Sequence, residues 1–91
     1  MKIQRRVFVS GRVQGVGFRA AAFREASQHA LKGYVRNLSD GRVEAVFMGS
    51  PEEVHRLVNW CTKGPIFSHV EAIQVLEEIP DTALSLFAVT S

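Results

Sequence analysis

The dipeptide Asp40-Gly41 constrains the fold of this chain more than any other short feature of the sequence. It separates two runs with the residue types of β-strands, Tyr34–Leu38 and Arg42–Met48. Asp-Gly readily adopts the positive φ angles of a tight hairpin turn, so the two runs are expected to pair antiparallel. The chain has 91 residues, which suffice for one domain around this hairpin. Residues 1–91 are therefore expected to form a single domain.

A strand and a helix are predicted before the hairpin. The run Val7–Val13 is rich in β-branched residues and predicts a strand. A glycine-rich break follows, and the Ala-rich segment Ala20–Leu31 then predicts a helix. The helix face that is expected to meet the core consists of Phe23, Ala26, Ala30 and Leu31.

A second helix is predicted after the hairpin, and its start is well marked. Ser50 can cap the first free N–H groups, Pro51 suits the first turn, and Glu53 completes a capping box. The helix is expected to end before Gly64-Pro65. Its core-facing stripe consists of Val54, Leu57, Val58 and Cys61.

Two further strands, Val70–Glu77 and Leu84–Thr90, complete the order β-α-β-β-α-β plus a C-terminal strand. This order predicts an α+β fold, a ferredoxin-like α/β sandwich with an antiparallel sheet and two helices on one face. The handedness of crossover connections places the third strand between the parallel first and second strands. The sequence does not fix the position of the last strand in the sheet.

Charge and composition narrow the possible partners. A net charge of +2, with a pI near 9.1, suits small anions and does not by itself indicate nucleic acid. No run approaches the roughly 18 apolar residues of a membrane span, and the N-terminus lacks the apolar core of a secretory signal. The single cysteine excludes an intrachain disulfide. We therefore expect a cytoplasmic monomer without a membrane or nucleic-acid partner.

The remaining aromatic, cysteine and acidic residues are expected to have structural roles. Cys61 lies on an apolar stripe and is expected to be a small buried hydrophobe. The three histidines are scattered, and their spacing predicts no metal site. Three acidic residues near the predicted fourth strand are expected to be solvated, namely Glu71, Glu77 and Glu78. The aromatic core candidates are Phe8, Phe18, Phe23, Phe47 and Phe87.

The loop Gly11–Arg19 is the segment that most clearly suggests chemistry. It joins a predicted strand to a predicted helix, and its glycines let backbone N–H groups surround an anion. Arg19 stands at the start of the helix, where the dipole disfavours a cation by about 0.3–1 kcal/mol. A bound phosphate would offset that cost, because a guanidinium can grip two of its oxygens. The spacing matches neither a Rossmann nor a Walker loop, and a plain turn with a solvated arginine is the alternative.

Asn37 lies near the end of the second predicted strand. Its side-chain amide can hold a water molecule by hydrogen bonding. An asparagine just before a turn is also a common part of the turn itself. From this residue alone, the turn role is the stronger interpretation.

Two segments resemble the signatures of a known family. Gly11–Arg19, with the sequence GRVQGVGFR, resembles the first signature of the acylphosphatase family. Gly33–Gly41, with the sequence GYVRNLSDG, resembles the second signature. Gly64-Pro65 followed by Val70 is similar to a later segment of the same family. The resemblance extends over nearly the whole chain.

This resemblance implies hydrolysis of the carboxyl–phosphate bond of acyl phosphates, without a metal or another cofactor. The expected partners are the small acyl phosphate substrate and inorganic phosphate, which is both product and inhibitor. By the resemblance, Arg19 and Asn37 are the catalytic residues: Arg19 binds the phosphoryl group and Asn37 positions the attacking water. The implied phosphate-binding residues are Gln14, Gly15, Val16, Gly17, Phe18 and Arg19.

The sequence departs from the family at two positions. Tyr34 stands where the family commonly has Trp, so an aromatic ring is kept. Ala30 stands where the family often has Gly, at the end of the first helix. Alanine in the left-handed conformation is strained by roughly 1 kcal/mol, so the helix is expected to end differently here.

Two other functions compete with hydrolysis. RNA-binding domains share this fold, but only Lys32-Gly33-Tyr34 resembles the start of their RNP1 motif. The third strand lacks the paired aromatic residues that stack on bases. An acylphosphatase-like module with a binding or regulatory role and no turnover is the closer rival. In some larger proteins such a domain serves carbamoyl phosphate chemistry. The presence of both Arg19 and Asn37 favours the enzyme.

Overall fold

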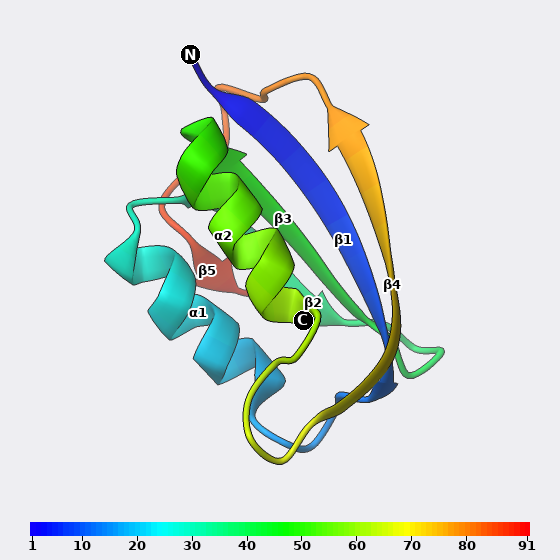
Figure 1. Ribbon diagram of the computed structural model, residues 1–91. Coiled ribbons are helices and arrows are strands. Elements are labelled where there is room, and N and C mark those ends of the chain that lie inside the picture. Colours follow the sequence, from blue (N-terminus) through cyan, green and yellow to red (C-terminus); the bar gives the residue numbers. More distant parts are fainter.

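The computed structural model describes residues 1–91. Its elements, in chain order, are β1 (Ile3–Arg12), α1 (Phe18–Gln28), β2 (Lys32–Asn37), β3 (Val43–Gly49), α2 (Pro51–Cys61), β4 (His69–Glu78) and β5 (Ala88–Val89). Both helices cover the same face of the sheet (Figure 1). The predicted ferredoxin-like α+β fold is confirmed. Neither helix combines the length and the apolar character needed to cross a bilayer.

The five strands form one sheet in the order β4-β1-β3-β2-β5. β3 is antiparallel to both β1 and β2, which confirms its predicted position between them. The turn between β2 and β3 closes where Asp40-Gly41 predicts it, with Leu38 N donating to Arg42 O at 2.8 Å. Asn37 therefore ends β2 opposite Val43, at the same end of the sheet as the loop that leaves β1.

The start of α2 follows the predicted cap in part. Ser50 Oγ accepts a hydrogen bond from Glu53 N at 3.4 Å. The Glu53 carboxylate does not return to Ser50 but lies 2.6 Å from His29 Nδ1, so only half of the capping box forms. The predicted stripe is buried at Val54, Leu57 and Cys61. Burial raises the pKa of Cys61 to about 12, so its thiol is no nucleophile at neutral pH.

α1 differs from the prediction in its limits and in its buried face. It begins at Phe18, two residues early, because Gly17 at φ 81° turns the chain directly into the helix. Phe23 is 41% exposed, so its predicted place in the core is wrong. The residues that α1 buries are Phe18, Ala21, Ala22 and Ala26. Their three small side chains let the helix lie close to the sheet, and this leaves no space there for a second phenyl ring.

Ala30 adopts the left-handed conformation that the sequence led us to expect the helix to avoid. Its φ is 56°, the only positive value outside glycine. Leu31 N donates to Ala26 O at 3.1 Å, and Ala30 N donates to Ser27 O at 3.3 Å. These two bonds define a Schellman motif, whose apolar contact is supplied by the buried Ala26 and Leu31. The hydrogen bonds and the burial of Leu31 hold alanine in a strained backbone region.

Ala30→Gly is expected to stabilise the protein by roughly 0.5–1 kcal/mol. Removal of the Cβ relieves left-handed strain of about 1–2 kcal/mol, and the greater chain entropy of glycine offsets about 0.5–1 kcal/mol of that gain. Urea unfolding measures the difference. Ser27→Gly, one turn earlier in the helix, is the control and is expected to destabilise by a similar amount. A lower urea midpoint for Ala30→Gly would contradict this account of the helix end.

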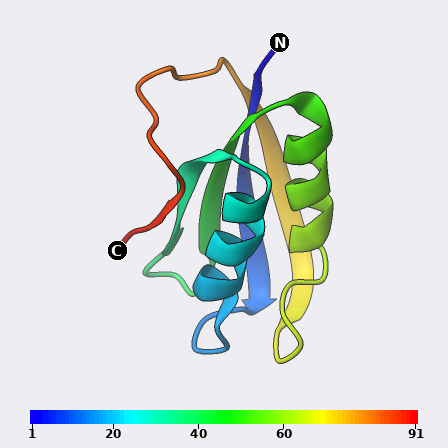
Figure 2. The same cartoon turned by 90° about the vertical axis from the view of Figure 1, so that its left-hand side faces the viewer.

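The C-terminal segment is less regular than predicted. Only Ala88–Val89 is a strand, in place of the expected 84–90, and it pairs parallel with β2 at the edge of the sheet. Phe87 anchors the segment, because it is buried and stacks on Phe47 with ring centroids 5.5 Å apart. Thr90 N donates to Val35 O at 2.9 Å. The chain thus returns to the sheet beside α1, as the view in Figure 2 shows.

The sheet face away from the helices carries a charge network that the sequence analysis missed. Glu44 of β3 is buried and pairs with both Arg6 and Arg36. Arg6 also binds Glu78 at 2.7 Å and holds the pKa of that carboxyl below its usual range, so Glu78 is not simply solvated as predicted. Phe8 is half-buried beneath the Arg42 guanidinium, away from the main core.

Candidate active site

Two glycines set the backbone of the loop between β1 and α1. Gly15 and Gly17 have φ angles of 74° and 81°, which strain any residue with a Cβ. A Cβ built on either glycine would meet no atom within 4 Å. The backbone angle, and not a lack of space, therefore requires glycine here. The loop delivers the chain to the N-terminus of α1, where free N–H groups and the helix dipole favour an anion.

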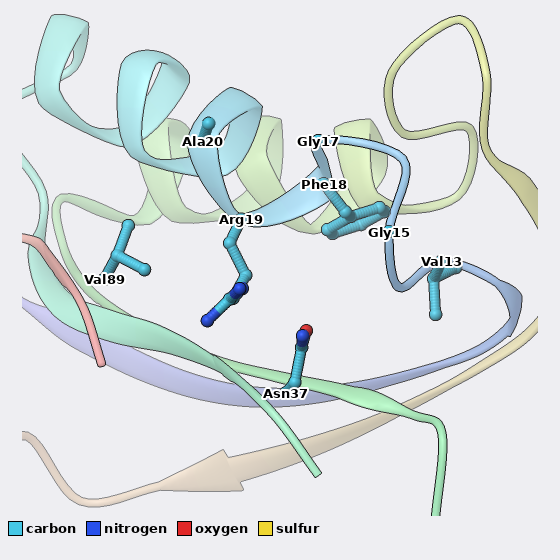
Figure 3. Close-up of a pocket in the computed structure, with 8 residues that line it drawn as sticks. All are labelled: Val13, Gly15, Gly17, Phe18, Arg19, Ala20, Asn37 and Val89. Atoms are coloured by element: carbon cyan, nitrogen blue, oxygen red, sulfur yellow. The ribbon is translucent and has the colours of Figure 1, made fainter. Parts of the chain in front are cut away.

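A pocket of about 260 Å³ opens at this helix N-terminus. It lies between the first turn of α1, the end of β2 and β5 (Figure 3). Its lining residues are Val13, Gly15, Gly17, Phe18, Arg19, Ala20, Asn37 and Val89. Five of the residues implied by the family resemblance are thus brought together from two distant parts of the sequence.

Arg19 enters the pocket from the first turn of α1, and its guanidinium extends toward the sheet (Figure 3). Three arginines form no ion pair in the protein, namely Arg12, Arg19 and Arg24, and of these only Arg19 lines the pocket. A cation at the start of a helix is disfavoured by about 0.3–1 kcal/mol. Because no carboxylate compensates, the arrangement favours a bound anion that can accept two hydrogen bonds from the guanidinium.

Asn37 faces Arg19 across the pocket from the end of β2 (Figure 3). Its Oδ1 is buried and accepts no hydrogen bond from the protein. An unsatisfied buried acceptor costs about 1–3 kcal/mol. A water molecule that donates to this oxygen would remove the cost, and the hydrogen bond would fix the water's orientation between Asn37 and Arg19.

Three of the loop residues implied by the family resemblance line the pocket only in part or not at all. Phe18 is buried, and its ring lies 5.2 Å from that of Trp60, so only part of the residue lines the pocket. Val16 packs against the core and does not line the pocket. The Gln14 side chain is turned to the hairpin, where Nε2 donates to Leu38 O at 2.8 Å and to Arg42 O at 2.9 Å. Gln14 thereby ties the loop to the chain that follows Asn37.

Three lining residues were missed by the sequence analysis, namely Val13, Ala20 and Val89. Ala20 follows Arg19 in the same helical turn, so its place could have been read from the helix start. Val89 lines the pocket only because β5 pairs with β2, and no local pattern predicts that pairing. The lining offers no carboxylate, imidazole or thiol, and nowhere do three or more such groups cluster as metal ligands.

Comparison with known proteins assigns the chain to a family. The family model described as acylphosphatase matches residues 5–89. The chain belongs to the acylphosphatase family. This acylphosphatase match includes every residue that lines the pocket, from Val13 to Val89.

Individual acylphosphatases resemble the chain along most of its length. It is 47% identical to the acylphosphatase of Chloroflexus aurantiacus over 87 residues, which cover 96% of this chain and 95% of the relative. It is 54% identical to the acylphosphatase of a Roseiflexus species over 74 residues, or 81% of this chain and 80% of the relative. The crystal structure of the Bacillus subtilis acylphosphatase superposes with a TM-score of 0.93 at 37% identity, covering 98% of this chain and 99% of that one.

Proposed function

We propose that this protein hydrolyses the carboxyl–phosphate bond of acyl phosphates with an oriented water molecule and without a metal. The observation that carries the proposal is the pairing of two unpartnered groups across one pocket. Arg19 has no anionic partner and Asn37 Oδ1 has no donor, yet they face each other beside the N-terminus of α1. A phosphoryl group and a water molecule supply what both groups lack. Membership of the acylphosphatase family supports the substrate class.

In the proposed reaction the loop from Gly15 to Phe18 and the guanidinium of Arg19 hold the phosphoryl oxygens. The water held by Asn37 attacks phosphorus, and the bond from phosphorus to the carboxylate oxygen breaks with its electron pair on that oxygen. One water proton passes to a phosphoryl oxygen, so R–CO–O–PO₃²⁻ and H₂O give R–COO⁻ and H₂PO₄⁻. Positioning and charge stabilisation dominate phosphoryl transfer, so few protein groups are needed.

A metal-free reaction is consistent with the chemistry of the donor set. The pocket lining contains no carboxylate, imidazole or thiol that would ligate a cation. The positive charge comes from Arg19 and from the helix N-terminus. The leaving group is a weakly basic carboxylate, which departs without a general acid.

Acetyl phosphate hydrolysis in the presence of a chelator tests the proposal. The purified protein is expected to keep its full rate in excess EDTA, because no step depends on a metal. Inorganic phosphate is expected to inhibit competitively, since it binds to the same loop as the phosphoryl group of the substrate. A rate that falls in EDTA and returns with added Mg²⁺ would contradict the metal-free mechanism. Phosphate binding without any turnover would instead favour the regulatory module.

Replacement of Gln14 is expected to weaken the site without touching the phosphoryl group. Gln14→Met keeps the length of the side chain but removes the two hydrogen bonds to Leu38 O and Arg42 O. We expect stability to fall by about 1–3 kcal/mol, because two hydrogen bonds of about 0.5–1.5 kcal/mol each are lost, although each carbonyl keeps one backbone donor. We expect kcat/KM for acetyl phosphate to fall about tenfold, because a small misplacement of oriented groups is costly.

The control for Gln14→Met is Gln74→Met, on the exposed part of β4. That variant is expected to match the wild type in both stability and kcat/KM. Full activity in a destabilised Gln14→Met protein would show that the loop keeps its position without this tie.

Two further expectations belong to the same proposal. We place the reaction in the cytoplasm, where the free, buried thiol of Cys61 would stay reduced. We also propose that one chain is sufficient for activity, because one chain by itself brings Arg19, Asn37 and the glycine-rich loop together. Sedimentation at assay concentrations tests the monomer, and a dimer as the only active species would contradict it.

A further inference from the structure

A second, apolar hollow lies further along α1. It has a volume of about 290 Å³ and is lined by Phe23, Ser27, Ala30, Leu31, Leu86 and Phe87. Ala20 of the pocket and Phe23 of the hollow are three residues apart on α1, and so share one side of the helix. Val89 of the pocket lies two residues from Phe87 of the hollow on the C-terminal segment. The pocket and the hollow thus border the same two elements, α1 and the C-terminal segment, and we call the hollow together with Ala20 and Val89 the acyl groove.

Phe23 is the most unusual member of the acyl groove. It is 41% exposed, although it lies on the helix that packs against the core. It follows Arg19 by four residues, a rise of roughly 6 Å along the helix. Helical side chains lean toward the N-terminus, so the Phe23 ring leans over the turn that carries Arg19. An exposed phenyl ring thus stands one helical turn beyond the residue that carries the guanidinium of the site.

The acyl groove differs in chemistry from the other hollow beside α1. That hollow lies toward α2 and is lined in part by Arg24, Glu25 and Gln28. The acyl groove itself, from Ala20 and Val89 onward, has no charged side chain, and Ser27 is its one polar member. An apolar group loses no hydrogen bonds in such surroundings and gains from leaving water. A charged group would give up its hydration there without a partner.

We propose that the acyl groove binds the acyl group of the substrate and selects acyl phosphates with an apolar chain or ring. The proposal rests on the hydrolysis proposed above, because the phosphoryl group must first be held by Arg19 and the loop. The acyl group then extends from the phosphate site between α1 and the C-terminal segment. Phe23 and Leu86 form the outer walls, and Phe87, packed on Phe47, forms the floor. Phe23 is thus a specificity-determining residue that makes no contact with the phosphoryl group.

Acetyl and hexanoyl phosphate form a matched pair of substrates for the test. Their carboxylate leaving groups have nearly equal basicity, so a difference in kcat/KM reports contacts made by the longer chain. The wild type is expected to have a kcat/KM about tenfold higher for hexanoyl phosphate than for acetyl phosphate. This ratio is smaller than the one expected if all four additional methylene groups were completely buried. Phe23→Ala is expected to lower this preference about fivefold, the size of one lost aromatic contact. Phe23→Leu is expected to retain most of it.

Two variants separate the acyl groove from indirect effects. Phe67→Ala removes an aromatic ring that is 77% exposed in the connection before β4, and it is expected to keep the wild-type preference. Leu86→Ser changes the opposite wall of the groove and is expected to lower the preference about threefold. The inhibition constant of inorganic phosphate, which fills only the phosphoryl site, is expected to stay within about twofold in Phe23→Ala.

The outcomes distinguish this proposal from the one on which it rests. Hydrolysis of neither substrate by the wild type would overturn the proposed function and the acyl groove together. Hydrolysis of both substrates with equal kcat/KM would overturn the acyl groove alone. An unchanged preference in folded Phe23→Ala and Leu86→Ser proteins would do the same. A preference that falls in both variants, with phosphate inhibition retained, supports the groove.

Discussion

Arg19→Ala is expected to lower kcat/KM for acetyl phosphate by at least about 1,000-fold, the range seen when an arginine that stabilises a transferring phosphoryl group is lost. Arg19 is the only arginine among the residues that line the pocket, and no carboxylate of the protein engages it. Its loss removes the charge that meets the phosphoryl oxygens. Arg19→Lys restores a charge but not a bidentate grip, so a loss of about 100-fold is expected to remain.

The stability of Arg19→Ala separates a lost catalytic group from a damaged fold. Removing a cation from the first turn of a helix is expected to raise stability by about 0.3–1 kcal/mol. The variant is therefore expected to be nearly inactive and slightly more stable in urea. Arg24→Ala, on an exposed position of the same helix, is the matched control and is expected to keep full activity. An Arg19→Ala protein with more than a tenth of wild-type activity would refute the assignment of this residue.

Asn37→Ala is expected to lower kcat for acetyl phosphate by about 100-fold to 1,000-fold, the range for removal of one preorganised polar group. The effect should lie in kcat, because Asn37 is proposed to hold the water and not the phosphoryl group. The inhibition constant of inorganic phosphate is therefore expected to change by less than about threefold, whereas Arg19→Ala should weaken it strongly. Steady-state kinetics with phosphate as inhibitor measure both parameters.

Two further variants complete the test of Asn37. Asn59→Ala changes an exposed asparagine of α2 and is expected to match the wild type. Asn37→Asp keeps the shape of the side chain but adds a negative charge beside the phosphoryl group, so KM is expected to rise as well. Unchanged kcat in Asn37→Ala would mean that the water is held by another group. A loss confined to KM would mean that Asn37 binds the substrate.

Features with local causes were predictable from the sequence. The hairpin at Asp40-Gly41 and the helix start at Ser50 depend on residues only a few positions apart, and both are found where predicted. The central place of β3 followed from the order of elements and the handedness of crossovers. The cation at the start of α1 also has a local cause, since the strand, the glycines and Arg19 are adjacent in sequence.

Features that depend on distant contacts were not predictable. The apolar residues of α1 form two overlapping stripes on the helix, one with Phe18 and one with Phe23. Packing against the sheet buries the stripe with Phe18 and leaves Phe23 exposed, and the sequence alone does not show which stripe is buried. The place of Val89 depends on pairing with Val35, which is far away in sequence. The Gln14 side chain finds its acceptors at Leu38 and Arg42, which no spacing within the loop indicates.

The family resemblance supplied what residue patterns could not. Asn37 before a turn has an ordinary structural explanation, and only the resemblance singled it out. The structure adds a physical observation of its own, since its Oδ1 is buried without a donor and faces the pocket. At Ala30 the physical expectation was wrong instead. The strain of a left-handed alanine predicted that the helix would end in another way, but Ala30 is left-handed and the Schellman hydrogen bonds hold it there.

The fate of the water oxygen tests the central claim most directly. Acetyl phosphate is hydrolysed by the protein in ¹⁸O-labelled water, and mass spectrometry locates the label in the two products. Attack on phosphorus by the water at Asn37 predicts one labelled oxygen in inorganic phosphate and none in acetate. Label in acetate would mean attack at the carbonyl carbon, and it would contradict the roles assigned to Arg19 and Asn37.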